Sequence, residues 1–183
     1  MHTNKAAIQV EFKRTADSLN TFAYMGSLMS FLVEGEETNR QFALMEYRAK
    51  PGNEPPPHIH EWVDETLYIL EGEVEVYQGD AVLRLGPGDC LFTPKGPPHA
   101  WYILTSTVRI LGMVAPAHID LYFKEMMSLQ AQSTELPAAA VTYAMDDPQR
   151  AISLGRRHGC RFLSPEETRQ ALPKYPGFGI PRT

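Results

Sequence analysis

Short apolar segments bounded by Gly and Pro recur through the middle of the chain and limit the folds it can adopt. We expect strands at residues 66–70, 73–77, 81–85, 90–93, 99–104 and 108–114. Residues 73–77 alternate strictly, with Val74 and Val76 on one face and Glu73 and Glu75 on the other. The segments between these strands leave no room for the helices that parallel βαβ units need. The pattern therefore predicts an all-β fold, an antiparallel β-sandwich or barrel.

The residues before this central body predict further strands and an arm. Residues 27–33 and 41–47 are strand-like and are expected to form a hairpin. Residues 8–12 alternate apolar and polar side chains, which indicates a short strand. We expect residues 1–25 to form either an edge strand or an N-terminal arm that docks on a second subunit.

After residue 116 the period of the apolar residues changes from that of a strand to that of a helix. The apolar positions of this expected amphipathic helix are Ile119, Tyr122, Phe123, Met126 and Leu129. We expect the helix to cover the outside of the sheet, so that residues 26–130 form a barrel with a packing helix. Residues 131–183 are expected to be a linker and a C-terminal helical extension, whose last helix begins at a capping box, Ser164 to Glu167.

Composition and charge exclude several classes of protein. The 183 residues are 43% hydrophobic and 21% charged, which is typical of a soluble globular chain. The net charge of −5 and the absence of a Lys/Arg cluster argue against nucleic acid as a partner. No apolar run reaches the length of a signal peptide or a membrane span, so we expect no membrane partner and a cytoplasmic location. Cys90 and Cys160 are expected to be reduced thiols in packing positions.

Two histidines and a glutamate within eight residues indicate a metal site. His58 and His60 are two positions apart, so on an extended segment their imidazoles point to the same side. Glu65 follows after a short acidic link that lets the chain bend, and His99 begins another expected strand. These four residues are the predicted metal ligands, and the prolines of residues 50–57 give His58 a stiff extended approach.

Two motifs contain these ligands, G-x5-H-x-H-x4-E-x6-G and G-x5-P-x-G-x2-H. Their defined positions are Gly52, His58, His60, Glu65 and Gly72, then Gly88, Pro94, Gly96 and His99. Both motifs resemble those of the cupin superfamily, and this resemblance implies a jelly-roll barrel. Ile103 departs from the family pattern, which commonly has Asn there, so a polar contact near the pocket mouth is in doubt.

Residues 20–128 also resemble the small single-domain quercetin dioxygenase-like cupins. This resemblance implies a divalent metal held by three histidines and one glutamate, with dioxygen cleaving a flavonol or another enolisable aromatic substrate. It also implies that Glu65 is catalytic, as a base on the substrate hydroxyl. The ligand set suits Fe, Ni, Co, Mn, Cu or Zn, so the sequence does not identify the metal.

Strand alternation predicts the side chains that share the ligand side of the barrel. Leu67 and Ile69 alternate with Glu65, and Trp101 and Ile103 alternate with His99. Together they predict an apolar, partly aromatic wall. This wall is either the pocket for a planar, apolar to phenolic ligand or simply barrel core.

Three functions are compatible with these features. The first is a metal-dependent dioxygenase that uses dioxygen and a small aromatic or enolisable, flavonol-like substrate. The second is a non-redox metal-dependent isomerase, lyase or cyclase, since the same cation serves either chemistry. The third is a metal-dependent small-molecule binding protein without catalysis, which the absence of a helix-turn-helix output domain makes less favoured. We also expect a homodimer.

Overall fold

The computed structural model describes residues 11–127, 131, 133–136 and 148–178. The strands are β1 (Thr21–Tyr24), β2 (Ser27–Val33), β3 (Ala43–Ala49), β4 (His58–His60), β5 (Asp64–Glu71), β6 (Val74–Gln78), β7 (Ala81–Leu85), β8 (Cys90–Thr93), β9 (Ala100–Ile103), β10 (Val108–Ala115) and β11 (Cys160–Phe162). The helices are a 3-10 helix, η1 (Gly35–Thr38), and the α-helices α1 (Ile119–Met126), α2 (Pro148–Arg157) and α3 (Pro165–Ala171). None of the helices in these described ranges is long and apolar enough to span a membrane.

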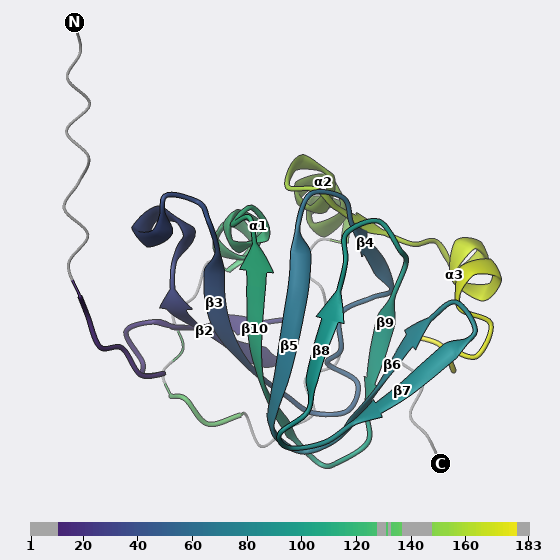
Figure 1. The fold of residues 1–183 in the computed structure, drawn as a ribbon, viewed down its shortest axis with the longest axis horizontal. Coiled ribbons are helices and arrows are strands. Elements are labelled where there is room, and N and C mark those ends of the chain that lie inside the picture. The colour runs from purple at the N-terminus through teal and green to yellow at the C-terminus, as the bar shows by residue number, and fades with distance from the viewer. Residues whose placement is uncertain (1–10, 128–130, 132, 137–147, 179–183) are drawn as a thin grey trace, which may run out of the picture.

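The strands form antiparallel sheets that enclose one main core. The large sheet has the order β1-β2-β3-β10-β5-β8, a smaller sheet has the order β7-β6-β9, and β11 pairs with β4. Figure 1 shows β3, β10, β5 and β8 running side by side, with β6, β7 and β9 grouped beside them. Alternate side chains of β5 point inward, so Leu67 and Ile69 are buried while Tyr68 between them is exposed. The predicted antiparallel β fold with C-terminal helices is confirmed.

Strand β1 differs from the expected arrangement at the N-terminus. The alternating segment 8–12 lies mostly outside the described residues, and Phe12 is in no strand. The strand instead spans Thr21–Tyr24 and pairs with β2, opposite Ser30. The Thr21 and Ser30 hydroxyls are 2.6 Å apart and buried. The strand has only four residues and is buried at both ends rather than at alternate positions, so the sequence shows no apolar alternation there.

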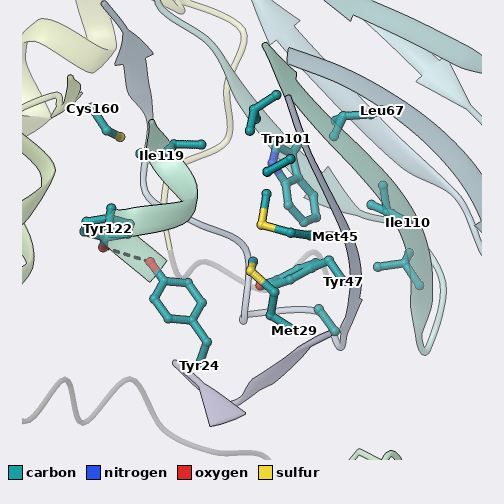
Figure 2. Packing of buried hydrophobic residues seen from close by; sticks show 14 of the residues in the cluster. Tyr24, Met29, Met45, Tyr47, Leu67, Trp101, Ile110, Ile119, Tyr122 and Cys160 are labelled. Carbon is teal, nitrogen blue, oxygen red and sulfur yellow. Dashed lines mark hydrogen bonds between the residues drawn. The ribbon is translucent and has the colours of Figure 1, made fainter. Parts of the chain in front are cut away.

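Helix α1 begins at the predicted Ile119 and ends at Met126, and the predicted position Leu129 lies outside the described residues. The helix does more than cover the outside of the sheet. Ile119 and Tyr122 are buried in the main core cluster, and the Tyr122 hydroxyl is 2.9 Å from the hydroxyl of Tyr24 on β1. Figure 2 shows Ile119 and Tyr122 facing side chains of the barrel strands. The helix therefore contributes to the interior of the barrel.

The C-terminal segment also packs on the barrel. Strand β11 pairs antiparallel with β4, with Cys160 opposite His60 and Phe162 opposite His58. No strand was predicted at residues 160–162. Cys160 is buried in a packing position, as expected, whereas Cys90 is exposed, so the packing position expected for Cys90 was wrong. Helix α3 begins at the predicted capping box, in which the Ser164 hydroxyl accepts from the Glu167 amide and the Glu167 carboxylate accepts from the Ser164 amide.

Candidate metal centre

The predicted ligands come from three chain segments that belong to different sheets. His58 and His60 point to the same side of β4, Glu65 is near the start of β5, and His99 immediately precedes β9. The three histidines are buried. His58 and His99 also exchange backbone hydrogen bonds, each amide donating to the other's carbonyl at 3.0 Å. The two motifs are thus joined by the main chain at the site itself.

The imidazoles converge on one point. One ring nitrogen from each of His58, His60 and His99 lies within 4.8 Å of the other two. The Nε2 atoms of His58 and His60 are 3.2 Å apart. Two nitrogens at that spacing can bind one ion through bonds of about 2.0–2.1 Å. The Glu65 carboxylate lies 3.8 Å from Nε2 of His60 and 3.8 Å from Nε2 of His99. The buried cluster is consistent with a metal ion.

Main-chain carbonyls orient two of the rings. The Nδ1 atom of His58 lies 2.8 Å from the Pro56 carbonyl, and Nδ1 of His99 lies 3.2 Å from the Pro97 carbonyl. A carbonyl only accepts, so each Nδ1 carries the proton and each Nε2 keeps its lone pair. Within the described residues, the buried Nε2 of His99 has no hydrogen-bond partner. A cation is a fitting partner for this atom, because unpaired buried nitrogens are rare.

The ionisation of the site favours cation binding. Burial lowers the pKa of His58 well below its usual value and also lowers the pKa of His99, so both rings are neutral near pH 7. Burial raises the pKa of Glu65, but His60 and, in their protonated forms at low pH, the other two histidines outweigh it and lower the pKa to about 2. Neutral imidazoles and an ionised carboxylate are the forms that bind metals.

A cavity of about 80 Å³ adjoins the histidines. Its lining is mainly apolar and aromatic and consists of Tyr24, Met29, Met45, Tyr47, Pro55, His58, His60, Glu65, Leu67, Trp101, Ile110, Gly112, Ile119, Phe123, Cys160 and Phe162. Figure 2 shows several of these side chains, with Met45, Tyr47 and Trp101 clustered together. The Tyr47 and Trp101 rings pack edge to face with centroids 5.6 Å apart.

The predicted wall lies partly in this lining. Leu67 and Trp101 line the cavity, whereas Ile69 and Ile103 are fully buried in the surrounding core and do not line it. At Ile103 the polar contact is made by the main chain, whose amide donates to the buried Glu54 carboxylate at 2.8 Å. Two of the four predicted wall residues therefore belong to the barrel core and not to the cavity lining.

Sequence reasoning missed several residues that line the cavity. Met45 and Tyr47 alternate along β3, a signal that was available but was not connected to the site. Cys160 and Phe162 lie on a three-residue strand, which is too short for a periodicity argument. His158 and Trp62 lie outside the cluster, where His158 contacts Glu125 at 2.7 Å and the exposed Trp62 packs on the surface.

Trp62 packs edge to face with His118, with ring centroids 6.0 Å apart. The indole also lies close to Gly159, where an added Cβ would clash with the ring. These contacts give Trp62 a packing role at the surface.

Comparisons with known proteins identify one domain type. Residues 45–114 match the family model described as "Cupin domain". Quercetin 2,3-dioxygenase of Bacillus subtilis (strain 168) is 25% identical over 91 residues, which are 50% of this chain and 27% of that protein. The chain therefore spans about a quarter of that relative's length.

Solved structures with similar folds have varied names. A protein with a double-stranded β-helix domain from Klebsiella pneumoniae is 23% identical, with a TM-score of 0.48 over 58% of this chain and 92% of that one. KdgF from Halomonas sp. is 21% identical, with a TM-score of 0.48 over 54% and 86%. A predicted oxalate decarboxylase from Thermotoga maritima is 23% identical, with a TM-score of 0.46 over 49% and 80%.

Proposed function

Since this chain is a cupin domain protein, we propose that it is a metal-dependent dioxygenase acting on a small aromatic or otherwise enolisable substrate. The observation that carries the proposal is the buried cluster of three histidines, with the Glu65 carboxylate beside it, at the edge of an apolar cavity. The similarity to quercetin 2,3-dioxygenase over 91 residues supports the reaction class.

The proposed ligands are His58, His60 and His99, each through Nε2, with Glu65 as the fourth. Their three nitrogens and one oxygen suit Fe, Ni, Co, Mn, Cu or Zn. When bound, such an ion supplies Lewis acidity that makes an enol hydroxyl more acidic. The carbonyls of Pro56 and Pro97 hold two of the rings in the ligating tautomer.

Glu65 is proposed to take the proton from the substrate hydroxyl. Its pKa of about 2 means that it is ionised near pH 7 and that it is a weak base. The transfer is therefore favourable only for a hydroxyl whose acidity is raised at the site. Leu67 and Trp101 exclude water from the same cavity, which strengthens the electrostatic interactions inside it.

Removal of one ligand tests the metal assignment. His99→Ala should lose most of the bound metal, because it removes one of the four proposed ligands. The barrel should still fold, because the strands that carry the other ligands are unchanged. His118→Ala is the control, since this histidine lies outside the cluster and packs against Trp62. Metal content is measured by elemental analysis and folding by circular dichroism. Full stoichiometric metal in folded His99→Ala would refute the ligand assignment.

Paired aerobic and anaerobic assays test the reaction class. Metal-loaded protein should consume oxygen with a member of a panel of flavonols and smaller enols, and Glu65→Gln should slow this consumption. Turnover that continues without oxygen would instead identify a non-redox isomerase, lyase or cyclase with the same ligands. Tight binding without turnover under either condition would identify a binding protein.

A further inference from the structure

The cavity beside the histidines is small for a flavonol. Its volume is about 80 Å³. Sites for drug-sized ligands have volumes of about 300–1,000 Å³, several times this value. We propose that the substrate is an enol that contains at most one ring, and that strand β11 limits the size of the ligand that the cavity can hold. The proposal rests on the function proposed above.

Strand β11 forms a wall of the cavity although it lies outside the family-matched residues 45–114. Its pairing with β4 places Cys160 opposite His60 and Phe162 opposite His58. Directly opposed residues of an antiparallel pair point to the same face, so both side chains lie on the ligand side of β4. The Phe162 ring is 6.3 Å from the His58 ring, between centroids. Phe162 thus occupies space next to a proposed metal ligand.

This wall is firmly attached to the barrel. The Leu163 amide donates to the Pro57 carbonyl at 2.8 Å, and the Glu61 amide donates to the Gly159 carbonyl at 2.7 Å. These bonds extend the β4–β11 pairing beyond both ends of β11. The Phe162 ring also packs against Tyr122 of α1, with centroids 6.2 Å apart. Displacing the wall to admit a larger ligand would break these contacts, so the folded protein keeps the cavity at this size.

The cavity also favours a substrate whose body is apolar. The Tyr24 hydroxyl is paired with that of Tyr122 at 2.9 Å, and the Tyr47 hydroxyl donates to the Asn53 carbonyl at 2.7 Å. These phenols are already partnered, so a polyhydroxylated ring would have to break existing bonds to be satisfied. The chemistry that fits is a one-ring hydroxy ketone, with polar atoms at the metal and alkyl groups elsewhere.

Two ligands with the same chelating group test the size limit. Maltol is a single 3-hydroxy-4-pyranone ring with a methyl group, and 3-hydroxyflavone is the same ring enlarged by a fused benzene and a phenyl group. Binding to metal-loaded protein is measured without oxygen, from the absorbance change of the enolate. We expect maltol to bind at least tenfold more tightly. Tighter binding of 3-hydroxyflavone, or binding of neither compound, would overturn the proposal.

Enlarging the cavity tests the role of β11. Phe162→Ala should improve the affinity for 3-hydroxyflavone at least tenfold, whereas Phe92→Ala should not change it, because Phe92 is 60% exposed on β8. If Phe162→Ala does not fold, Met45→Ala removes volume from another part of the lining, with the exposed Met113 as its matched control. A folded Phe162→Ala protein that still excludes the flavone would refute the assignment to β11. If only Met45→Ala folds, continued exclusion of 3-hydroxyflavone by that variant would refute the size limit.

The outcome is separable from that of the proposed function. Preferential binding of maltol without oxygen uptake would support the size limit and count against the dioxygenase. Oxygen uptake with 3-hydroxyflavone, bound more tightly than maltol, would support the dioxygenase and overturn the size limit.

Discussion

Replacing Gly72 by alanine should destabilise the protein by about 2–5 kcal/mol. Gly72 has φ +79°, and a Cβ on it would meet the Thr107 carbonyl oxygen at far less than van der Waals distance and lie 2.6 Å from the Thr105 hydroxyl oxygen. A left-handed conformation costs a non-glycine residue about 1–2 kcal/mol. Overpacking against backbone atoms adds about 1–3 kcal/mol, because the carbonyl cannot rotate away as a flexible side chain can.

Gly79→Ala separates these two contributions. Gly79 has φ +55°, but an added Cβ would have no atom within 4 Å, so only the backbone cost of about 1–2 kcal/mol applies. Both variants are unfolded in urea and followed by circular dichroism. With a denaturant slope of about 2 kcal/mol/M, the midpoint should fall by about 1–2.5 M for Gly72→Ala and by under about 1 M for the control. Equal losses would refute the clash with the turn before β10.

Two further predictions concern the thiols and the last helix. Burial, together with Glu65 and Glu61, raises the pKa of Cys160. Iodoacetamide should therefore label only the exposed Cys90 in native protein at pH 8, and both thiols after denaturation. Labelling is measured by mass spectrometry, and equal labelling of the two thiols in native protein would contradict this prediction. Ser164→Ala should weaken the capping box by about 1 kcal/mol and speed amide exchange in α3, whereas the exposed Ser153→Ala should leave α3 unchanged.

The barrel strands and the proposed ligands were predictable because their signals are local. Ala81–Leu85 and Cys90–Thr93 begin and end where turn residues indicated. The spacing of His58 and His60 placed both imidazoles on one side of a strand, as the structure shows. His99 needed a second motif, and the structure joins it to His58 through the main chain.

The remaining features depend on contacts that no local pattern carries. Strand β1 has only four residues, and one of its buried contacts is a hydroxyl pair, while β11 is too short to show a period. Helix α1 was located correctly in the sequence, but an amphipathic pattern does not say which surface its apolar face meets. The homodimer, the arm at residues 1–25, the boundary at residue 130 and the cytoplasmic location stay predictions.

The pairing of β4 with β11 also has a consequence for the order in which the protein is assembled during synthesis. Strands β5 to β10 can pair with neighbours made within the same stretch of chain, whereas the pairing of His60 with Cys160 joins positions 100 residues apart. Contacts between positions far apart in the sequence form late, and β11 leaves the ribosome after all the barrel strands. The strand that presents two of the three histidines is therefore among the last to gain its full set of neighbours.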